Sequence, residues 1–120
     1  MDTIATPSLR MLGATKLTGD SVVNVQGEHL GKIEELMLDL DRGCVAYAVL
    51  SFGSILGMGG KYFALPWSAL TVDTIEKRVV LNVTKDILEK APGFDKDHWP
   101  NMAEATWGAA VYNHYGSKPY

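Results

Sequence analysis

The chain has 120 residues, with 11 Lys and Arg against 14 Asp and Glu and a formal net charge of −3. Its longest basic run is Lys77-Arg78, so the basic patch that nucleic-acid binding usually needs is missing. No apolar run approaches the ~20 residues that cross a bilayer, and we expect one soluble, cytoplasmic domain with no nucleic-acid partner and no transmembrane segment.

The first part of the chain has the patterns of β-strands. Residues 1–11 show no sustained period and are expected to form a lead-in. A β-branched run at 21–25 predicts the first strand. From Leu36 apolar residues alternate with polar ones, but Ile33 lies three residues before Leu36. A β-bulge near Glu34-Glu35 would restore the alternation.

The strand expected at 45–52 is apolar on both faces: Val45, Tyr47 and Val49 fall on one, and Ala46, Ala48, Leu50 and Phe52 on the other. One face of a barrel strand lines the core, so the other must be covered by a tail, a helix or a second subunit. Further strands are expected at 62–65, 70–72 and 78–83. The predicted core residues are Leu36, Leu38, Leu50, Leu65, Leu81 and Val83, with Tyr47 and Val49 on the opposite, covered face.

Helical patterns begin after the last predicted strand. Thr84 is a suitable N-cap for a short helix at 85–91, which Pro92-Gly93 ends. Near the C-terminus Trp107, Ala110, Val111 and His114 recur at helical spacing. An amphipathic helix must lay its apolar stripe on another surface, and the barrel or a second subunit are both available.

Four short segments, in this order, resemble the PRC-barrel family: Gly31-Lys32-Ile33, Asp39-Leu40-Asp41 with Gly43, Tyr47-Ala48-Val49-Leu50, and Phe63-Ala64-Leu65-Pro66-Trp67. The resemblance implies a mainly β fold: a small PRC-type barrel of five or six mostly antiparallel strands, a short helix and a C-terminal, aromatic-rich helical extension. We assign residues 12–94 to the barrel and 95–120 to the extension. Relatives such as the photosynthetic reaction-centre H subunit and a ribosome-maturation factor use this barrel to dock on larger assemblies, and the family has no common catalytic apparatus.

Two segments imitate ligand-binding loops. The Gly-rich stretch 53–61 has Ile55 where a phosphate-binding loop needs glycine, and Tyr62 where it needs Ser or Thr. Asp39-Leu40-Asp41 begins like a calcium loop, but Leu50 stands where the bidentate glutamate belongs. We expect a strand connection at the first and a turn at the second.

The remaining reactive side chains form no recognisable centre. His29, His98 and His114 are far apart and lack metal-ligand spacing, and the single cysteine, Cys44, opens an apolar strand. We therefore predict no catalytic residue, metal or cofactor.

The leading hypothesis is a non-enzymatic interaction or assembly module that forms a homodimer and docks on a protein partner. The candidate interaction surface combines the loop residues Ile55, Leu56 and Met58 with the C-terminal residues Trp99, Trp107, Val111 and Tyr115. The alternative is small-molecule binding or enzymatic activity in a crevice between barrel and tail near Trp67, His98 and Trp99.

Overall fold

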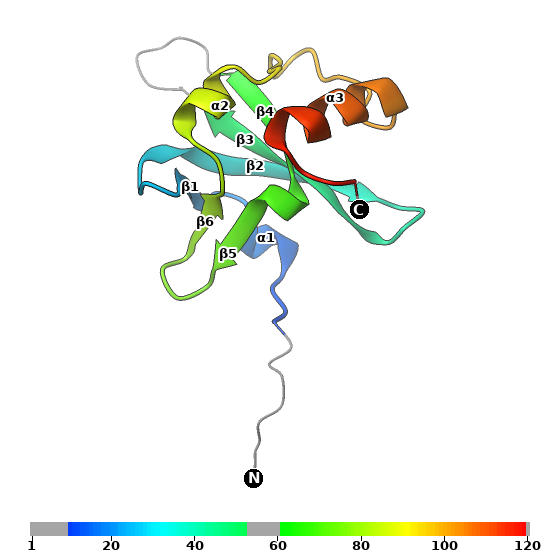
Figure 1. The fold of residues 1–120 in the computed structure, drawn as a ribbon. Coiled ribbons are helices and arrows are strands. Elements are labelled where there is room, and N and C mark those ends of the chain that lie inside the picture. The colour runs from blue at the N-terminus through cyan, green and yellow to red at the C-terminus, as the bar shows by residue number, and fades with distance from the viewer. Residues whose placement is uncertain (1–9, 53–60, 120) are drawn as a thin grey trace.

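The computed structural model describes residues 10–52 and 61–119 and contains one curled, six-stranded sheet (Figure 1). The strands are β1 (Ser21–Asn24), β2 (His29–Asp39), β3 (Cys44–Phe52), β4 (Lys61–Pro66), β5 (Leu70–Asp73) and β6 (Arg78–Leu81). Their order in the sheet is β4-β3-β2-β1-β6-β5. β1 and β6 pair in parallel, and the other neighbours pair antiparallel. The predicted mainly β, mostly antiparallel fold is confirmed.

Within the described residues the sheet is accompanied by α1 (Ala14–Leu17), the 3₁₀-helix η2 (Trp67–Ala69), α2 (Lys85–Glu89) and α3 (Ala105–Tyr115). The sequence patterns predicted helix only after Thr84, so α1 and η2 are corrections. Both are single turns of three or four residues, and such short segments carry no apolar period.

Two irregularities shape the β2–β3 pairing. The predicted bulge is confirmed, because Ile33 pairs with Leu50 while Glu35 pairs with Val49 and leaves Glu34 extra on β2. A second irregularity, which we did not predict, leaves Ala46 extra on β3, since Met37 pairs with Tyr47 and Leu38 with Val45. The bulge moves Val45 to the face of Leu38, so its predicted place beside Tyr47 is wrong.

The core is close to the predicted one. Leu50, Leu65 and Leu81 are fully buried, and on the opposite face Val49 is fully buried and Tyr47 is buried. Leu36 and Val83 are half-buried and pack against the buried core residues. Leu38 is the exception: it is 58% exposed, because it lies on a part of the hairpin that extends past the neighbouring strands.

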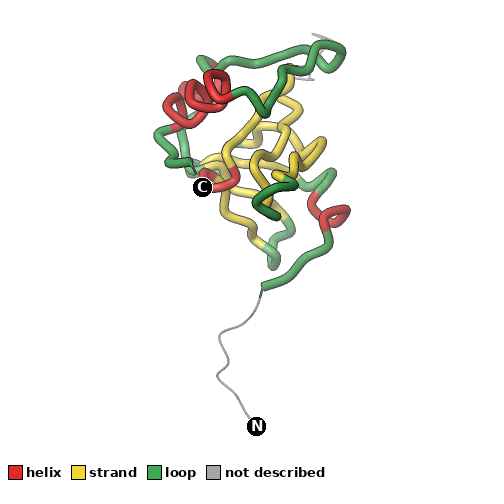
Figure 2. Tube along the Cα trace, turned by 90° about the vertical axis from the view of Figure 1, so that its right-hand side faces the viewer, coloured by secondary structure: helices red, strands yellow, loops and turns green. Residues whose placement is uncertain are grey.

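Helix α3 covers the outer face of β3 within the same chain (Figures 1 and 2). Its Trp107 ring meets Tyr47 edge-on, with 5.3 Å between centroids, and its Tyr112 ring lies 5.6 Å from Tyr47. The Glu104 carboxylate caps the helix by accepting a hydrogen bond from Trp107 N, and Gly116 ends it in the left-handed conformation at φ 65°. Of the stripe predicted for this helix, Val111 is buried and Trp107 and His114 are half-buried, but Ala110 is exposed. The buried face is completed by Gly108, Tyr112 and Tyr115, which the prediction did not include.

The segment before α3 is fixed to the free edge of β4. The backbone groups of Tyr62 and Phe94 exchange two hydrogen bonds of 2.9 Å, and the Trp99 ring packs edge-on against Tyr62. Farther along, His114 Nε2 lies 2.7 Å from the carbonyl oxygen of Ile87 in α2, which joins the two helices.

Candidate functional site

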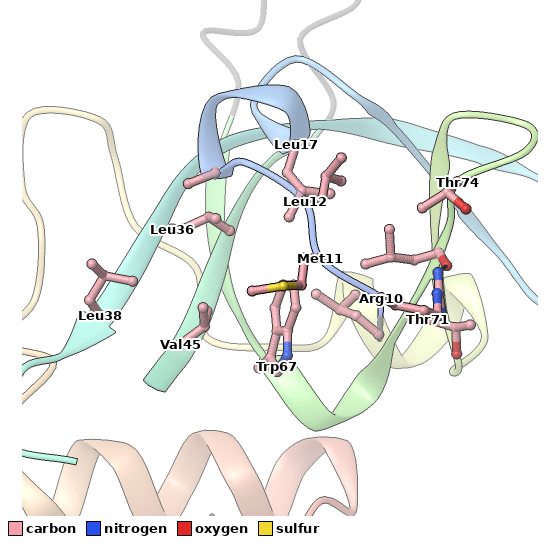
Figure 3. A pocket seen from close by; sticks show the side chains of 13 residues that line it. Arg10, Met11, Leu12, Leu17, Leu36, Leu38, Val45, Trp67, Thr71 and Thr74 are labelled. Carbon is pink, nitrogen blue, oxygen red and sulfur yellow. Dashed lines mark hydrogen bonds between the residues drawn. The ribbon is translucent and has the colours of Figure 1, made fainter. Parts of the chain in front are cut away.

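An apolar cleft of about 730 Å³ lies between the N-terminal segment and the open side of the sheet (Figure 3). Its main apolar lining residues are Met11, Leu12, Leu36, Leu38, Val45 and Trp67. Figure 3 shows residues 10–12 crossing between β5 and the β2–β3 hairpin, with the Trp67 indole close to Met11.

Each wall of the cleft comes from a different local feature of the sequence. The Ala46 bulge turns Val45 to the same side as Leu36 and Leu38, which provides the first wall. The single turn of η2 places Trp67 at the base, and Leu70 and Val72 of β5 form the second wall.

Arg10 fixes the N-terminal segment to the second wall. Its Nη2 donates a hydrogen bond of 2.6 Å to the carbonyl oxygen of Val72. The next residue, Asp73, accepts hydrogen bonds from the backbone N–H groups of Glu76 and Ile75, which together with nearby Arg78 and Arg10 lower the pKa of its carboxyl. At this end of the cleft, the Arg10 guanidinium therefore holds the N-terminal segment on β5, and backbone hydrogen bonds to Asp73 hold the turn that follows β5.

The chemistry of the cleft favours apolar contact. Arg10 is the only titratable side chain among its described lining residues, and its guanidinium is already hydrogen-bonded to Val72. Within residues 10–52 and 61–119, no three His, Cys, Asp or Glu side chains gather as they would around a metal ion. The arrangement holds no acid–base pair and can bury apolar surface.

Large apolar side chains stand exposed in and beside the cleft. Met11 is 87% exposed, Leu12 47%, Leu38 58% and the adjoining Leu40 85%. We call these four residues, with Trp67 at the base, the cleft face. Contiguous exposed apolar surface of this kind marks an interaction site more often than an isolated exposed leucine does.

The predicted interaction residues are distributed differently. Ile55, Leu56 and Met58 lie outside the described residues. Trp99 is 41% exposed, and its Nε1 donates a hydrogen bond to the carbonyl oxygen of Lys96.

The residues predicted on α3 belong to the interior. Trp107 is half-buried against Tyr47, while Val111 and Tyr115 are buried at 1% and 7% exposure. Assigning Val111 and Tyr115 to an interaction surface was wrong, because the sheet of the same chain covers them. The Tyr115 hydroxyl has no hydrogen-bond partner among the described residues, and burial raises its pKa.

The crevice of the alternative hypothesis is not assembled. Trp67 faces the N-terminal cleft, whereas Trp99 packs on Tyr62 near the other end of β4. The five residue steps from Tyr62 to Trp67 span about 17 Å of extended chain. These side chains therefore cannot surround one small ligand.

The sequence patterns did not predict the cleft face. Met11 lies in the segment assigned to the lead-in, and Leu38 was assigned to the core. The adjacent apolar pair Met11-Leu12, just before α1, was the available signal.

A protein-family model described as PRC-barrel domain matches residues 10–88, which include every residue named above for the cleft. A search of curated proteins finds no match. In the part of the chain that the structure describes, no helix has the length and apolar character needed to cross a membrane.

Proposed function

Because the chain belongs to the PRC-barrel domain family, we propose that it is a non-enzymatic interaction module that self-associates and docks on a larger assembly, and that protein covers its cleft face. The observation that carries this proposal is the apolar cleft itself, with Met11 and Leu38 exposed in its lining and Leu40 exposed two residues beyond Leu38 on the same hairpin. We place the module in the cytoplasm, where a free thiol such as Cys44 stays reduced.

Exposed apolar surface gives the cleft face its capacity to bind. Burying apolar surface contributes roughly 25 cal/mol per Å², so a partner that covers several large side chains gains a few kcal/mol before the costs of association. The cleft face also needs little rearrangement, because Arg10 already holds the N-terminal segment on β5. A preformed apolar site loses less entropy on binding.

A small apolar molecule is the alternative occupant, since about 730 Å³ falls within the range of ligand pockets. Such pockets usually enclose most of the ligand and direct several polar groups at it. Here Arg10 is already hydrogen-bonded to the chain, and Met11 remains 87% exposed. These features favour a protein surface, which covers the cleft from outside.

Photo-cross-linking in the source cells tests the proposal. A benzophenone amino acid at position 38 is expected to join the chain to protein, whether a second copy or another molecule. The same probe at position 25 is the control, because Val25 is 57% exposed, close to the 58% of Leu38, but lies in the β1–β2 turn. Equal protein adducts at both positions, or none at position 38, would overturn the proposal. Adducts with small molecules alone would support the alternative.

A further inference from the structure

We infer that the partner of the cleft face is a second copy of this chain, whose β2–β3 arm enters the cleft while its own cleft receives the first arm. The arm comprises residues 36–46, the end of the hairpin that projects past the neighbouring strands (Figure 1). This inference rests on the proposed function, because it names the occupant of the same surface.

The arm is a two-stranded ribbon with free edges on both sides. β2 has 11 residues and β3 has 9, but β1 has only 4 and β4 only 6. The described pairing with β4 stops at Tyr47, and the pairing with β1 stops at Lys32. A two-stranded ribbon alone has marginal stability in water, and unpaired edges favour association with another chain.

Among residues 10–52 and 61–119, one face of the arm is covered and the other is not. The side of Met37 and Tyr47 lies under α3, whose Trp107 and Tyr112 rings contact Tyr47. The other side carries Leu38 and Val45 and opens into the cleft. α3 therefore accounts for the apolar outer face of β3, and the uncovered apolar surface is the side of the arm that faces the cleft.

The position of the arm suits a symmetric pair. A two-fold interface uses the same patch on both copies, so the projecting arm and the cleft that receives it must lie next to each other on one chain. Here they share Leu38, which belongs to the arm and lines the cleft. Around a two-fold axis the two Leu38 side chains would meet, and each Leu40 would reach Met11 and Trp67 of the other copy.

Charge and area agree with this pairing. Asp41 stands exposed beside Arg42 at the tip of the arm, and Arg10 lines the N-terminal side of the cleft, so the Asp41 carboxylate of one copy would approach the Arg10 guanidinium of the other. The four exposed apolar side chains of the cleft face present roughly 400 to 500 Å² in each copy, and two copies approach the ~1,000 Å² that a specific dimer requires.

Light scattering of the purified full chain, behind a sizing column at micromolar concentration, is the first part of the test. The inference expects about 26 kDa, twice the 13.1 kDa of one chain. Leu38→Lys and Leu40→Lys should each restore the monomer mass, whereas Val25→Lys, at a position of matched exposure, should not. A monomeric parent, or a dimer that both arm variants leave intact, would overturn the inference.

Disulfide trapping is the second part of the test and determines which residues of the two copies lie close together. Chains with Leu40→Cys are mixed with chains carrying Met11→Cys, both in a Cys44→Ser background, and are then oxidised. The disulfide between the two variants should form at least tenfold faster than the disulfide in a control mixture in which Val25→Cys chains replace the Met11→Cys chains. Equal rates would overturn the arm-in-cleft arrangement. A monomeric chain that still forms adducts with another protein from position 38 would refute this inference and the self-association in the proposed function, but not docking on a larger assembly. Absence of any protein adduct would refute docking as well.

Discussion

Gly31→Ala is expected to destabilise the fold strongly, because the β3 backbone lies too close to Gly31 to admit a side chain. It pairs with Phe52, and a Cβ at this position would overlap the carbonyl oxygen of Ser51 and lie 2.9 Å from its carbonyl carbon. The obstructing atoms are backbone atoms of a buried strand, so rotation of a side chain cannot relieve the overlap. The backbone φ of 158° is also unfavourable for a residue with a side chain.

The expected cost follows from what must move. Relieving the overlap displaces β3 beside Leu50, which is fully buried, and disturbs both hydrogen bonding and core packing. Disruption of this kind typically costs about 2 to 4 kcal/mol, which in a chain of this size lowers the melting temperature by about 10 °C.

Urea unfolding followed by tryptophan fluorescence and circular dichroism measures the loss. Gly43→Ala is the matched control: Gly43 also has a positive φ, of 68°, but a Cβ there meets nothing within 4 Å. We expect the control to lose only about 1 kcal/mol. If Gly31→Ala unfolded within 0.5 kcal/mol of the parent, or if the control lost more, the described β2–β3 packing would be wrong.

Three further predictions concern the core and the C-terminal helix. Leu81→Ala removes a fully buried side chain and should cost about 2 to 5 kcal/mol in urea unfolding; a shift under one degree in thermal unfolding would contradict its core position. Trp107→Ala should cost about 3 kcal/mol, because its ring packs on Tyr47, without altering the mass in light scattering. Tyr115→Phe should cost little, because the hydroxyl has no described partner. Its raised pKa means that the folded state keeps the proton that the unfolded state loses above about pH 10, so stability falls with rising pH there, and pH-dependent unfolding should show a smaller fall in Tyr115→Phe.

The sequence predicted buried positions correctly where apolar and polar residues alternate regularly along a strand. Leu50, Leu65 and Leu81 follow a period of two and are buried, and the three-residue step from Ile33 to Leu36 revealed the first bulge. The second bulge, at Ala46, left no trace, because every residue of 45–52 except Ser51 is apolar, and a strand that is apolar on both faces shows no change of phase.

The cleft face was harder to foresee, because it depends on how far neighbouring strands extend. Leu38 has the pattern of a core residue, yet neither β1 nor β4 reaches it. Periodicity gives the direction of a side chain but does not show whether another element lies opposite. For the same reason the apolar stripe of α3 fitted a second subunit and the chain's own barrel equally well.

The most direct test of the central claim, that protein covers the cleft face, is the accessibility of position 38. A Leu38→Cys chain in the Cys44→Ser background is labelled with a maleimide, first alone at nanomolar dilution and then in an extract of the source cells freed of small molecules. We expect labelling at least tenfold slower in the extract, with no change for Val25→Cys, whose position has matched exposure. Equal rates at position 38 in the two conditions would contradict it.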